Sequence, residues 1–573
     1  MKPTHLRWMP ALAYAAALIF HTTGLAVHAQ AADSPNIVIV LIDDMGFADL
    51  GCYGGEVPTP NINKMADEGV RFTQFYNTAR CSTSRAALLT GLYPHQAGMG
   101  FLENLVIPDS KGTTGHLRDD CVTMAEVLNE AGYLTIMTGK WHLGQDRGSP
   151  PWKRGFARSL SANTGELYFP DQQQKRDAGI TLNGKRHDLD DPIFGKDWYG
   201  PDLLTEWGLK FVDEAIAENK PFFYYLPHCA THFPLQAPKE DIERYRGKYK
   251  VDWDKLREAR HKRQIEMGLV DPKWPLAERP PGVPDWDSLS EEDKDRFDNI
   301  MAIDAGMIDH LDRSVGMLLE GLKKRGVLDN TVVMLMCDNG GNAESGPRGR
   351  LEGDEPGGPN SVVFLGQSWA TVANTPFRRY KHFTHEGGIS TPLIVHWPAG
   401  INANRNGKLE PQPGHLVDLM PTVCELTGAK YPQEFKGNKI QPMEGTSLVP
   451  AFAGEPINRR QPIFFAHEGN RGVRDGKWKL VMKYKGPWEL YDMEADRTEQ
   501  HDLLAQEYEV ATRLVHAWND WAKRADVDPW VGPVRNDFGN EINRPDNQTD
   551  GQPLLLPGKK KQAAAAAAKA KSN

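Results

Sequence analysis

The stretch NIVIVLIDD, residues 36–44, joins a continuous apolar run to a pair of aspartates. The run at 36–42 is rich in β-branched residues and therefore predicts a β-strand. It lacks the polar alternation of a half-exposed strand, so we expect a sheet that is covered on both faces. Comparable apolar runs occur at 133–138, 222–226, 331–336 and 391–397.

Helical patterns separate these predicted strands. In residues 299–324, apolar side chains recur at three-, four- or seven-residue steps, as they do on the buried face of a helix. Strands that alternate with helices predict an α/β fold, with a large mixed, mostly parallel sheet flanked by helices. Ligands of such sheets bind beyond the carboxyl ends of the strands.

Polar side chains stand at or just beyond the ends of four predicted strands. They are Asp43 and Asp44, Lys140 and His142, His232, and Asp338 and Asn339. Each has an ordinary explanation alone, since Asp and Asn favour turns and a lone histidine is usually structural. If these side chains gather at one sheet edge, however, the aspartates and the asparagine would offer hard oxygen ligands. Such ligands favour Ca²⁺, with Mg²⁺ as the alternative, over zinc.

Lys140 and His142 are two residues apart, so in extended backbone their side chains would point the same way. Lysine neutralises a bound anion, and histidine exchanges a proton near neutral pH. Cationic side chains beside a divalent metal suit a tetrahedral oxyanion, either phosphate or sulfate.

The segment ARCSTSRAALLTG, residues 79–91, adds a thiol. We expect a helix to begin at Cys81, which places Arg85 one turn later on the same face. The free N–H groups at a helix N-terminus favour an anion there. Cys81 would then be a nucleophile beside an oxyanion, and the alternative is a buried, inert cysteine.

The same segment resembles the signature of the type I sulfatases, in which the cysteine is converted to formylglycine (3-oxoalanine). The usual core of that signature is C-x-P-x-R or C-x-A-x-R, and here Thr83 takes the middle place. The segment GYLTIMTGKWH, residues 132–142, is similar to a second signature of the family. Further similar segments follow in the family's order as far as residue 503, so the resemblance covers most of the chain.

This resemblance implies a metal site and a nucleophile. Asp43, Asp44, Asp338 and Asn339 would hold one divalent cation together with position 81. Cys81, as hydrated formylglycine, would attack the sulfur atom and displace the alcohol. Its second hydroxyl would allow sulfate to leave by elimination, which replaces a second attack by water.

The resemblance also implies the acid–base groups. Lys381 and His232 would contact the sulfate and help to protonate the leaving oxygen. His142, steadied by Lys140, would take the proton whose loss releases sulfate. Arg85 would hold the formylglycine and balance negative charge.

At the level of the whole protein, the resemblance implies an alkaline-phosphatase-like fold with a C-terminal subdomain built on a four-stranded antiparallel sheet. It implies a sulfated small molecule or glycan as substrate and maturation by a formylglycine-generating enzyme. Two alternatives stay open: a phosphonate monoester or phosphodiester hydrolase of the same superfamily, and a non-catalytic binder of sulfated glycans if Cys81 is unmodified. A zinc phosphatase would need more histidine ligands than these motifs supply, and His95, His310 and His385 are interpreted as structural.

The N-terminus predicts export. Lys2 and Arg7 precede an apolar run at 11–20, and small residues follow up to Ala31, as in a secretory signal peptide over residues 1–31. We therefore expect a periplasmic or secreted protein without a stable membrane anchor. The net charge of -9 predicts no nucleic-acid partner.

The mature chain divides into a catalytic domain at 32–455, a C-terminal subdomain at 456–535 and a tail at 536–573. Residues 239–292 read as a long charged excursion with helical pieces. The subdomain should hold antiparallel strands within 462–493 and a helix near 507–523. The tail is of low complexity and is expected to be disordered from 558. The six cysteines are scattered and predict no particular disulfide.

Overall fold

The computed structural model describes residues 34–163, 166–172, 179–530, 534–535 and 541–542. The predicted signal peptide and the predicted disordered segment from 558 lie outside these residues. Among the described residues, no helix combines the length and the apolar composition needed to cross a bilayer.

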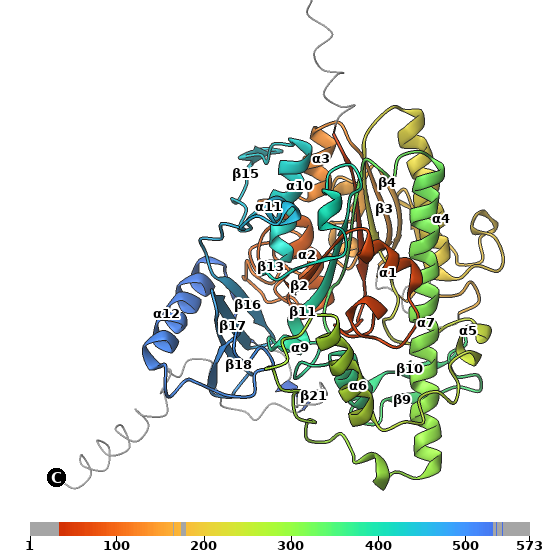
Figure 1. Ribbon diagram of the computed structural model, residues 1–573. Helices are drawn as coiled ribbons and strands as arrows, with labels where there is room; N and C mark the ends of the chain where they lie inside the picture. Colours follow the sequence, from red (N-terminus) through yellow and green to blue (C-terminus); the bar gives the residue numbers. More distant parts are fainter. Residues whose placement is uncertain (1–33, 164–165, 173–178, 531–533, 536–540, 543–573) are drawn as a thin grey trace, which may run out of the picture.

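An 11-stranded sheet forms the centre of the molecule (Figure 1). Its strands are β1 (Asn36–Ile42), β2 (Val70–Tyr76), β3 (Leu134–Lys140), β4 (Arg158–Ala162), β5 (Ile180–Leu182), β6 (Lys185–His187), β7 (Phe222–Pro227), β8 (Thr331–Cys337), β11 (Ser390–His396), β12 (Lys408–Glu410) and β13 (Gly414–His415). The order is β12-β2-β11-β8-β1-β7-β3-β4-β5-β6, with β13 also paired to β2. Strands β8, β1, β7, β3 and β4 are parallel, whereas β11 is antiparallel to both of its neighbours. The mixed, mostly parallel sheet is thus confirmed.

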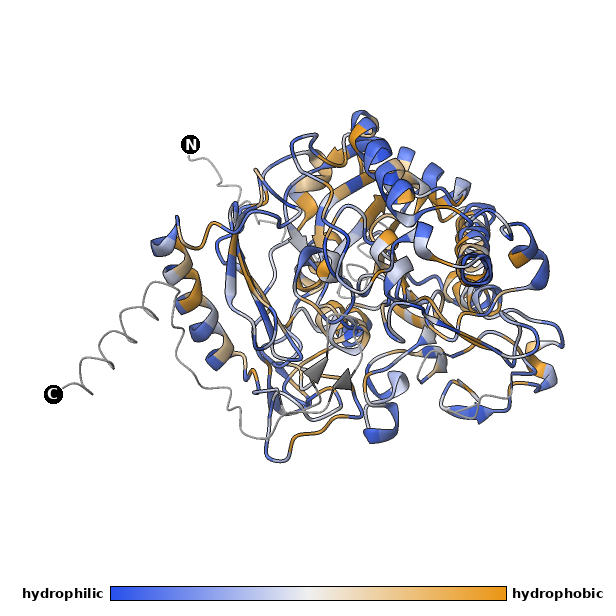
Figure 2. Cartoon of the chain, turned by 90° about the horizontal axis from the view of Figure 1, so that it is seen from below, coloured by the Kyte–Doolittle hydropathy of each residue, from blue (hydrophilic) through white to orange (hydrophobic). Residues whose placement is uncertain are grey.

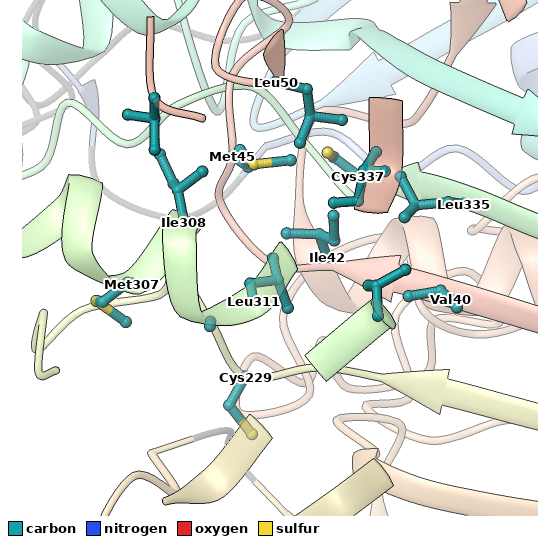
Figure 3. Close-up of a cluster of buried hydrophobic side chains, with 14 of the residues drawn as sticks. Val40, Ile42, Met45, Leu50, Cys229, Met307, Ile308, Leu311, Leu335 and Cys337 are labelled. Carbon is teal, nitrogen blue, oxygen red and sulfur yellow. The ribbon is translucent and has the colours of Figure 1, made fainter. Parts of the chain in front are cut away.

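Strand β1 shows why the sheet is apolar on both faces. Val38, Val40 and Ile42 belong to one hydrophobic core, and the alternate residues Ile37, Ile39 and Leu41 belong to a second core. All six side chains are fully buried. Each such burial is worth about 1.5–3 kcal/mol. Figure 3 shows Val40 and Ile42 among the side chains of the first core, including Leu311, Leu335 and Cys337.

Helices cover both faces of the sheet (Figure 1). Helices α1 (Pro60–Asp67), α4 (Gly200–Ala217) and α7 (Glu291–Lys324) contribute to the first core. Helices α2 (Cys81–Thr90), α3 (Met124–Glu130) and α10 (Leu419–Thr427) contribute to the second. Both faces of these parallel strands are apolar, so helices on both sides of the sheet keep them from water.

Helix α7 is longer than the predicted helix at 299–324. It begins at Glu291 because the Ser290 side chain accepts a hydrogen bond from the Asp293 amide and three acidic residues occupy its first turn. Negative charge is favourable at a helix N-terminus, and apolar periodicity gives no sign of this polar first part.

The excursion at 239–292 contains the helical pieces α5 (Lys239–Glu243) and α6 (Trp253–Glu266) and a short 3₁₀ turn (Trp286–Ser288). The remaining helices are α8 (Gly366–Ala373), α9 (Glu386–Ile389) and α11 (Val449–Ala453). The remaining short strands are β9 (Arg350–Glu352), β10 (Val362–Phe364), β14 (Glu434–Phe435), β15 (Asn438–Lys439), β20 (Val534–Arg535) and β21 (Glu541–Ile542).

A separate four-stranded antiparallel sheet follows near the C-terminus, which confirms the expected architecture. It consists of β16 (Ile463–His467), β17 (Asn470–Asp475), β18 (Trp478–Met482) and β19 (Trp488–Asp492) in that order. Helix α12 (Tyr508–Arg524) packs against β17 and β18. Its buried residues include Leu514, Trp518 and Trp521, and Figure 2 shows hydrophobic and hydrophilic residues in turn along this helix.

Candidate active site

Polar side chains from the ends of β1, β3 and β8 meet at one edge of the large sheet. Lys140 Nζ, at the last residue of β3, donates a hydrogen bond of 2.6 Å to Asp43 Oδ2. Arg85 of α2 donates to Asp338 Oδ2 at 2.7 Å and lies 3.3 Å from Asp43 Oδ2. The four side chains are fully buried. Residues that are far apart in sequence are therefore brought into direct contact.

Asp44 is the second centre of contacts. Lys381 Nζ donates to Oδ1 at 2.5 Å, and Asn339 Nδ2 donates to the same oxygen at 2.7 Å. His232 Nε2 lies 3.7 Å from Oδ2. Asn342 Nδ2 donates to Oδ2 at 2.8 Å. Sequence reasoning did not assign Asn342, although it stands in the same Asp-Asn-Gly-Gly-Asn turn as Asp338.

Helix α2 begins at Cys81, as the sequence predicts, and Arg80 is its extended N-cap residue. The preceding residue, Ala79, has a left-handed backbone with φ 64. The Thr83 hydroxyl lies 2.9 Å from the Arg80 carbonyl oxygen, to which it donates, and so ties the first turn together. Cys81 is 2% exposed, so its side chain meets the site rather than bulk water.

His142 lies beside Cys81, with Nδ1 3.3 Å from Sγ. The backbone is not extended from Lys140 to His142, because β3 ends at Lys140 and His142 has φ 57, so the geometric argument that their side chains point the same way does not apply. The left-handed turn directs Lys140 to Asp43 and His142 to Cys81. Spacing alone does not pair these two residues, because 61 positions separate them, whereas the family resemblance had implied that His142 acts on position 81.

Burial and neighbouring cations keep both site histidines neutral. Burial and then the charge of Lys140 lower the pKa of His142 to about 3. The same two causes lower the pKa of His232 to about 4. His232 Nδ1 donates to the Phe233 carbonyl at 2.6 Å, since a carbonyl can only accept, and Nε2 therefore carries the lone pair that faces Asp44.

The carboxylates differ in their surroundings. Burial alone would raise the pKa of Asp43, but the charges of Lys140 and Arg85 outweigh it and hold the pKa below its usual value. The charge of Lys381 has the same effect on the pKa of Asp44. Burial and the like charge of Asp43 raise the pKa of Asp338 well above its usual value. A cation among these groups would relieve that repulsion.

The oxygen atoms fit a divalent cation. Asp43 Oδ1 and Asn339 Oδ1 are buried and have no hydrogen-bond partner, an arrangement that is costly unless a ligand completes it. Atoms of Asp43, Asp44 and His232 that could bind a metal lie within 4.8 Å of one another. Carboxylate and amide oxygens are ligands of Ca²⁺ and Mg²⁺.

A second polar group lies nearby that sequence reasoning missed. Atoms of His382, His467 and Glu468 that could bind a metal also lie within 4.8 Å of one another. The available signals were weak: His382 follows Lys381, and Glu468 directly follows β16.

The residues interpreted as structural have other neighbours. His310 lies 2.8 Å from Asp202 and 2.6 Å from Asp241. His385 lies 3.6 Å from Glu489 of the C-terminal sheet. Each of the six cysteines is unpaired.

Two family profiles match the chain. The profile of the sulfatase family matches residues 35–429. The profile of the C-terminal region of N-sulphoglucosamine sulphohydrolase matches residues 378–520. An uncharacterized sulfatase of Schizosaccharomyces pombe is 33% identical over 519 residues, covering 84% of this chain and 92% of that relative. An arylsulfatase of Klebsiella aerogenes is 32% identical over 456 residues, covering 76% of this chain and 96% of that relative.

Solved structures are also similar to this chain. The crystal structure of Ps i-CgsB in complex with k-i-k-neocarrahexaose is 29% identical, with a TM-score of 0.64, and covers 85% of this chain and 93% of that chain. The phosphonate monoester hydrolase of Agrobacterium radiobacter is 19% identical, with a TM-score of 0.51 and coverage of 89% and 100%, and shares the fold. The chain belongs to the sulfatase family and is a sulfuric ester hydrolase.

Proposed function

We propose that this protein is an exported sulfatase that hydrolyses aryl or carbohydrate sulfate monoesters with formylglycine at position 81 and a bound divalent cation, Ca²⁺ in preference to Mg²⁺. The observation that carries the proposal is the contact between Cys81 and His142 beside carboxylates with unpartnered oxygens. A structural cysteine would need neither the neutral histidine nor the incomplete oxygen cluster.

The cation would be held by Asp43, Asp44, Asp338 and Asn339 together with position 81. When bound, it would lower the pKa of the attacking hydroxyl and offset charge on the transferring sulfate. The two oxygens without partners, Asp43 Oδ1 and Asn339 Oδ1, support this ligand set.

Position 81 supplies the nucleophile: as the hydrate of formylglycine it has one hydroxyl to attack sulfur and another to lose a proton when sulfate departs. Arg85, through its contacts with Asp43 and Asp338, fixes the carboxylates and places positive charge beside position 81. His142 Nδ1 is the base, because it lies 3.3 Å from Sγ and its low pKa keeps it unprotonated at neutral pH.

Lys381 and His232 face the sulfate. Both side chains are buried and lie at Asp44, whereas Lys140 contacts Asp43. The Lys381 ammonium would neutralise a sulfate oxygen and deliver the proton that the departing alcohol oxygen needs. His232, which is neutral in the free protein, would share this role once the charge of a bound sulfate raises its pKa. The net reaction consumes water and yields sulfate and the alcohol.

The N-terminal sequence pattern and the names of the relatives support the proposed cellular location and substrate. The N-terminal pattern at residues 1–31 supports export and removal of a signal peptide. Arylsulfatase and N-acetylgalactosamine-6-sulfatase among the relatives, and a solved relative bound to a carrahexaose, support a sulfated small molecule or glycan as substrate. The modification of Cys81 requires a formylglycine-generating partner. The domain boundaries at 32–455 and 456–535 and the tail at 536–573 remain part of this proposal.

The decisive experiment expresses the chain with and without a formylglycine-generating enzyme. The mass of the peptide that contains Cys81 reports conversion of thiol to aldehyde. We expect hydrolysis of 4-nitrophenyl sulfate only in converted protein, with no activity in Cys81→Ala. Faster hydrolysis of bis(4-nitrophenyl) phosphate would favour the phosphodiesterase alternative, and an unconverted thiol from a competent host would favour the binding protein.

A further inference from the structure

Five side chains beside position 81 have no role in the proposed reaction. We call them the Arg80 cluster, and they are Arg80, Glu344, His382, His467 and Glu468. They come from the N-cap of α2, from two loops and from the end of β16. Four of them are nearly inaccessible, and the Glu344 side chain is 17% exposed.

Charge contacts join the cluster into one unit. Arg80 donates to Glu344 Oε1 at 2.9 Å. His382 Nε2 lies 3.0 Å from that oxygen, and His382 Nδ1 lies 3.1 Å from Glu468 Oε2. His467 Nε2 extends the series, 3.6 Å from Glu468 Oε1.

The cluster is continuous with the catalytic residues. Arg80 precedes Cys81, and His382 follows Lys381. The Glu344 amide donates to Asn342 Oδ1 at 2.7 Å, and Asn342 donates in turn to Asp44. A molecule whose sulfate lay between Cys81 and Lys381 would therefore bring its neighbouring atoms to this cluster.

Some polar atoms of the cluster have no partner within the protein. Arg80 Nε and His467 Nδ1 are buried without a hydrogen-bond partner. Phe101 packs on one side of His467, with ring centroids 6.2 Å apart, and cannot supply one. A buried donor or acceptor left unpaired costs about 1–3 kcal/mol, so a ligand that pairs these atoms is favoured.

The backbone is also held in an unusual state here. His382 and Glu468 have left-handed conformations, with φ 83 and φ 47. Non-glycine residues in this region cost about 1–3 kcal/mol each and concentrate at functional sites. Asn470 Nδ2 donates to the carbonyls of both His382 and His467 at 3.0 Å, which binds the two loops to each other.

A metal ion does not suit this cluster, although three of its members could ligate one. Arg80 already places a permanent positive charge against Glu344 and the His382 ring. A second cation there would be repelled by the guanidinium. Neutral hydroxyl groups suit it better, because a hydroxyl donates to a carboxylate and accepts from Arg or His.

We propose that the Arg80 cluster determines substrate specificity by binding hydroxyl groups of the leaving alcohol, so that the enzyme selects sulfated sugars over sulfated phenols. This inference rests on the proposed sulfatase function. Glu344 is the member that such a ligand meets first, because it is the most exposed. A simple aryl sulfate such as 4-nitrophenyl sulfate has no free hydroxyl group, and sites built to pair a substrate hydroxyl discriminate strongly against analogues without it.

The test compares hexose monosulfates with 4-nitrophenyl sulfate in converted wild type, Glu344→Gln and Arg80→Lys. We expect the ratio of kcat/KM for the preferred hexose monosulfate to kcat/KM for 4-nitrophenyl sulfate to fall about 10- to 100-fold in each variant. Glu352→Gln, at an exposed glutamate of β9, is the matched control and should leave the ratio as in wild type.

A binding measurement separates this inference from the proposed function. Calorimetry on Cys81→Ala protein, which cannot turn over, should show at least about tenfold weaker binding of the hexose monosulfate when Glu344→Gln or Arg80→Lys is added. If these variants weaken binding but converted wild type hydrolyses no sulfate ester, the proposed function is wrong, while the assignment of the Arg80 cluster as a site for sugar hydroxyl groups still holds. Sulfatase activity with an unchanged substrate ratio in both variants, or no preference for any hexose monosulfate, would overturn the inference alone.

Discussion

Two of the buried groups of charged side chains differ in how well their atoms are paired. The first, which we call the catalytic group after its proposed role, consists of Asp43, Asp44 and Asp338 with the lysine and arginine side chains around them. The second, which we call the subdomain clamp, consists of Glu386, Lys479, Arg497 and Glu499, and it joins the main sheet to the C-terminal sheet. Every one of these carboxylates is at most 2% exposed.

In the subdomain clamp, both oxygens of Glu386 are occupied. Lys479 donates to Oε1 at 2.7 Å, and Arg497 donates to Oε2 at 3.0 Å. Lys479 also lies 2.8 Å from Glu499, whose other oxygen accepts from the Glu386 amide at 3.1 Å. Arg497 further donates to the Thr73 carbonyl at 2.6 Å, at strand β2.

In the catalytic group, by contrast, Asp43 Oδ1 and Asn339 Oδ1 lack hydrogen-bond partners, and Lys140 and Arg85 contact the other oxygen of Asp43. Glu499 Oε1 of the clamp also lacks a hydrogen bond, but it lies 2.8 Å from the Lys479 ammonium. Burial and charge are therefore common to both groups, and oxygens without a neighbouring cation distinguish the one that is proposed to bind a divalent ion. The clamp should govern stability, and the catalytic group should govern activity at little benefit to stability.

Asp338→Asn should give the largest effect. The amide keeps an acceptor for Arg85 but loses a charge that the cation needs. We expect kcat/KM for 4-nitrophenyl sulfate to fall about 10³- to 10⁴-fold. Without metal, the variant should unfold at the same urea concentration as metal-free wild type or at a slightly higher one, because repulsion between Asp43 and Asp338 is relieved. Asp354→Asn, at an exposed position, is the control. A marked loss of stability would show that Asp338 is mainly structural.

Glu386→Ala tests the clamp. Removal of this carboxylate leaves Lys479 and Arg497 without a buried partner, so the free energy of unfolding should fall by about 3–5 kcal/mol. Among molecules that remain folded, kcat/KM should change by less than about threefold. Urea unfolding and active-site titration measure the two quantities. An activity loss as large as that of Asp338→Asn would remove the distinction between the groups.

The pH dependence of stability gives a smaller effect. Burial lowers the pKa of His415 to about 3 and that of His228 to about 3, from 6.5 in the unfolded chain. A lowered histidine pKa means that the unfolded state binds more protons as the pH falls below 6.5. Each such histidine therefore destabilises the fold on acidification by up to about 1.4 kcal/mol per pH unit.

The subdomain clamp affects the free energy of unfolding over a different pH range. Burial would raise the pKa of Glu386, but Lys479 and Arg497 lower it to about 2, from 4.5 in the unfolded chain. Its contribution is present above pH 4.5 and is lost as the pH falls towards 2. Between pH 6.5 and 5.5, His415→Asn should thus reduce the slope of unfolding free energy against pH, whereas Glu386→Gln should lower stability with little change in that slope. An unchanged slope in His415→Asn would contradict this assignment.

The sequence predicted the elements that have strong periodicity. The continuous apolar run at β1 indicated a sheet buried on both faces, and the position of Asp43, Asp44 and Asp338 after strands indicated one shared edge. The first turn of α2 at Cys81 was also correct. These features depend on local pattern and on a general property of parallel sheets.

Other features depend on backbone geometry that no pattern encodes. The left-handed turn at His142 decides which side chain meets Cys81, and nothing in Lys140-Trp141-His142 specifies it. The Arg80 cluster requires a loop at His382 and a β16 end at His467 to lie together, a contact set by the position of the C-terminal sheet. Long-range loop placement is therefore what the sequence alone could not predict.

The central claim is that strand ends create a divalent cation site beside position 81, and calcium binding tests it most directly. Calorimetric titration of Ca²⁺ into metal-free, unconverted wild type should show one ion bound per chain. Asp338→Asn should weaken this binding about 100-fold or more, and Glu386→Gln should leave it unchanged. Absence of binding in wild type, or equal binding in Asp338→Asn, would contradict the account.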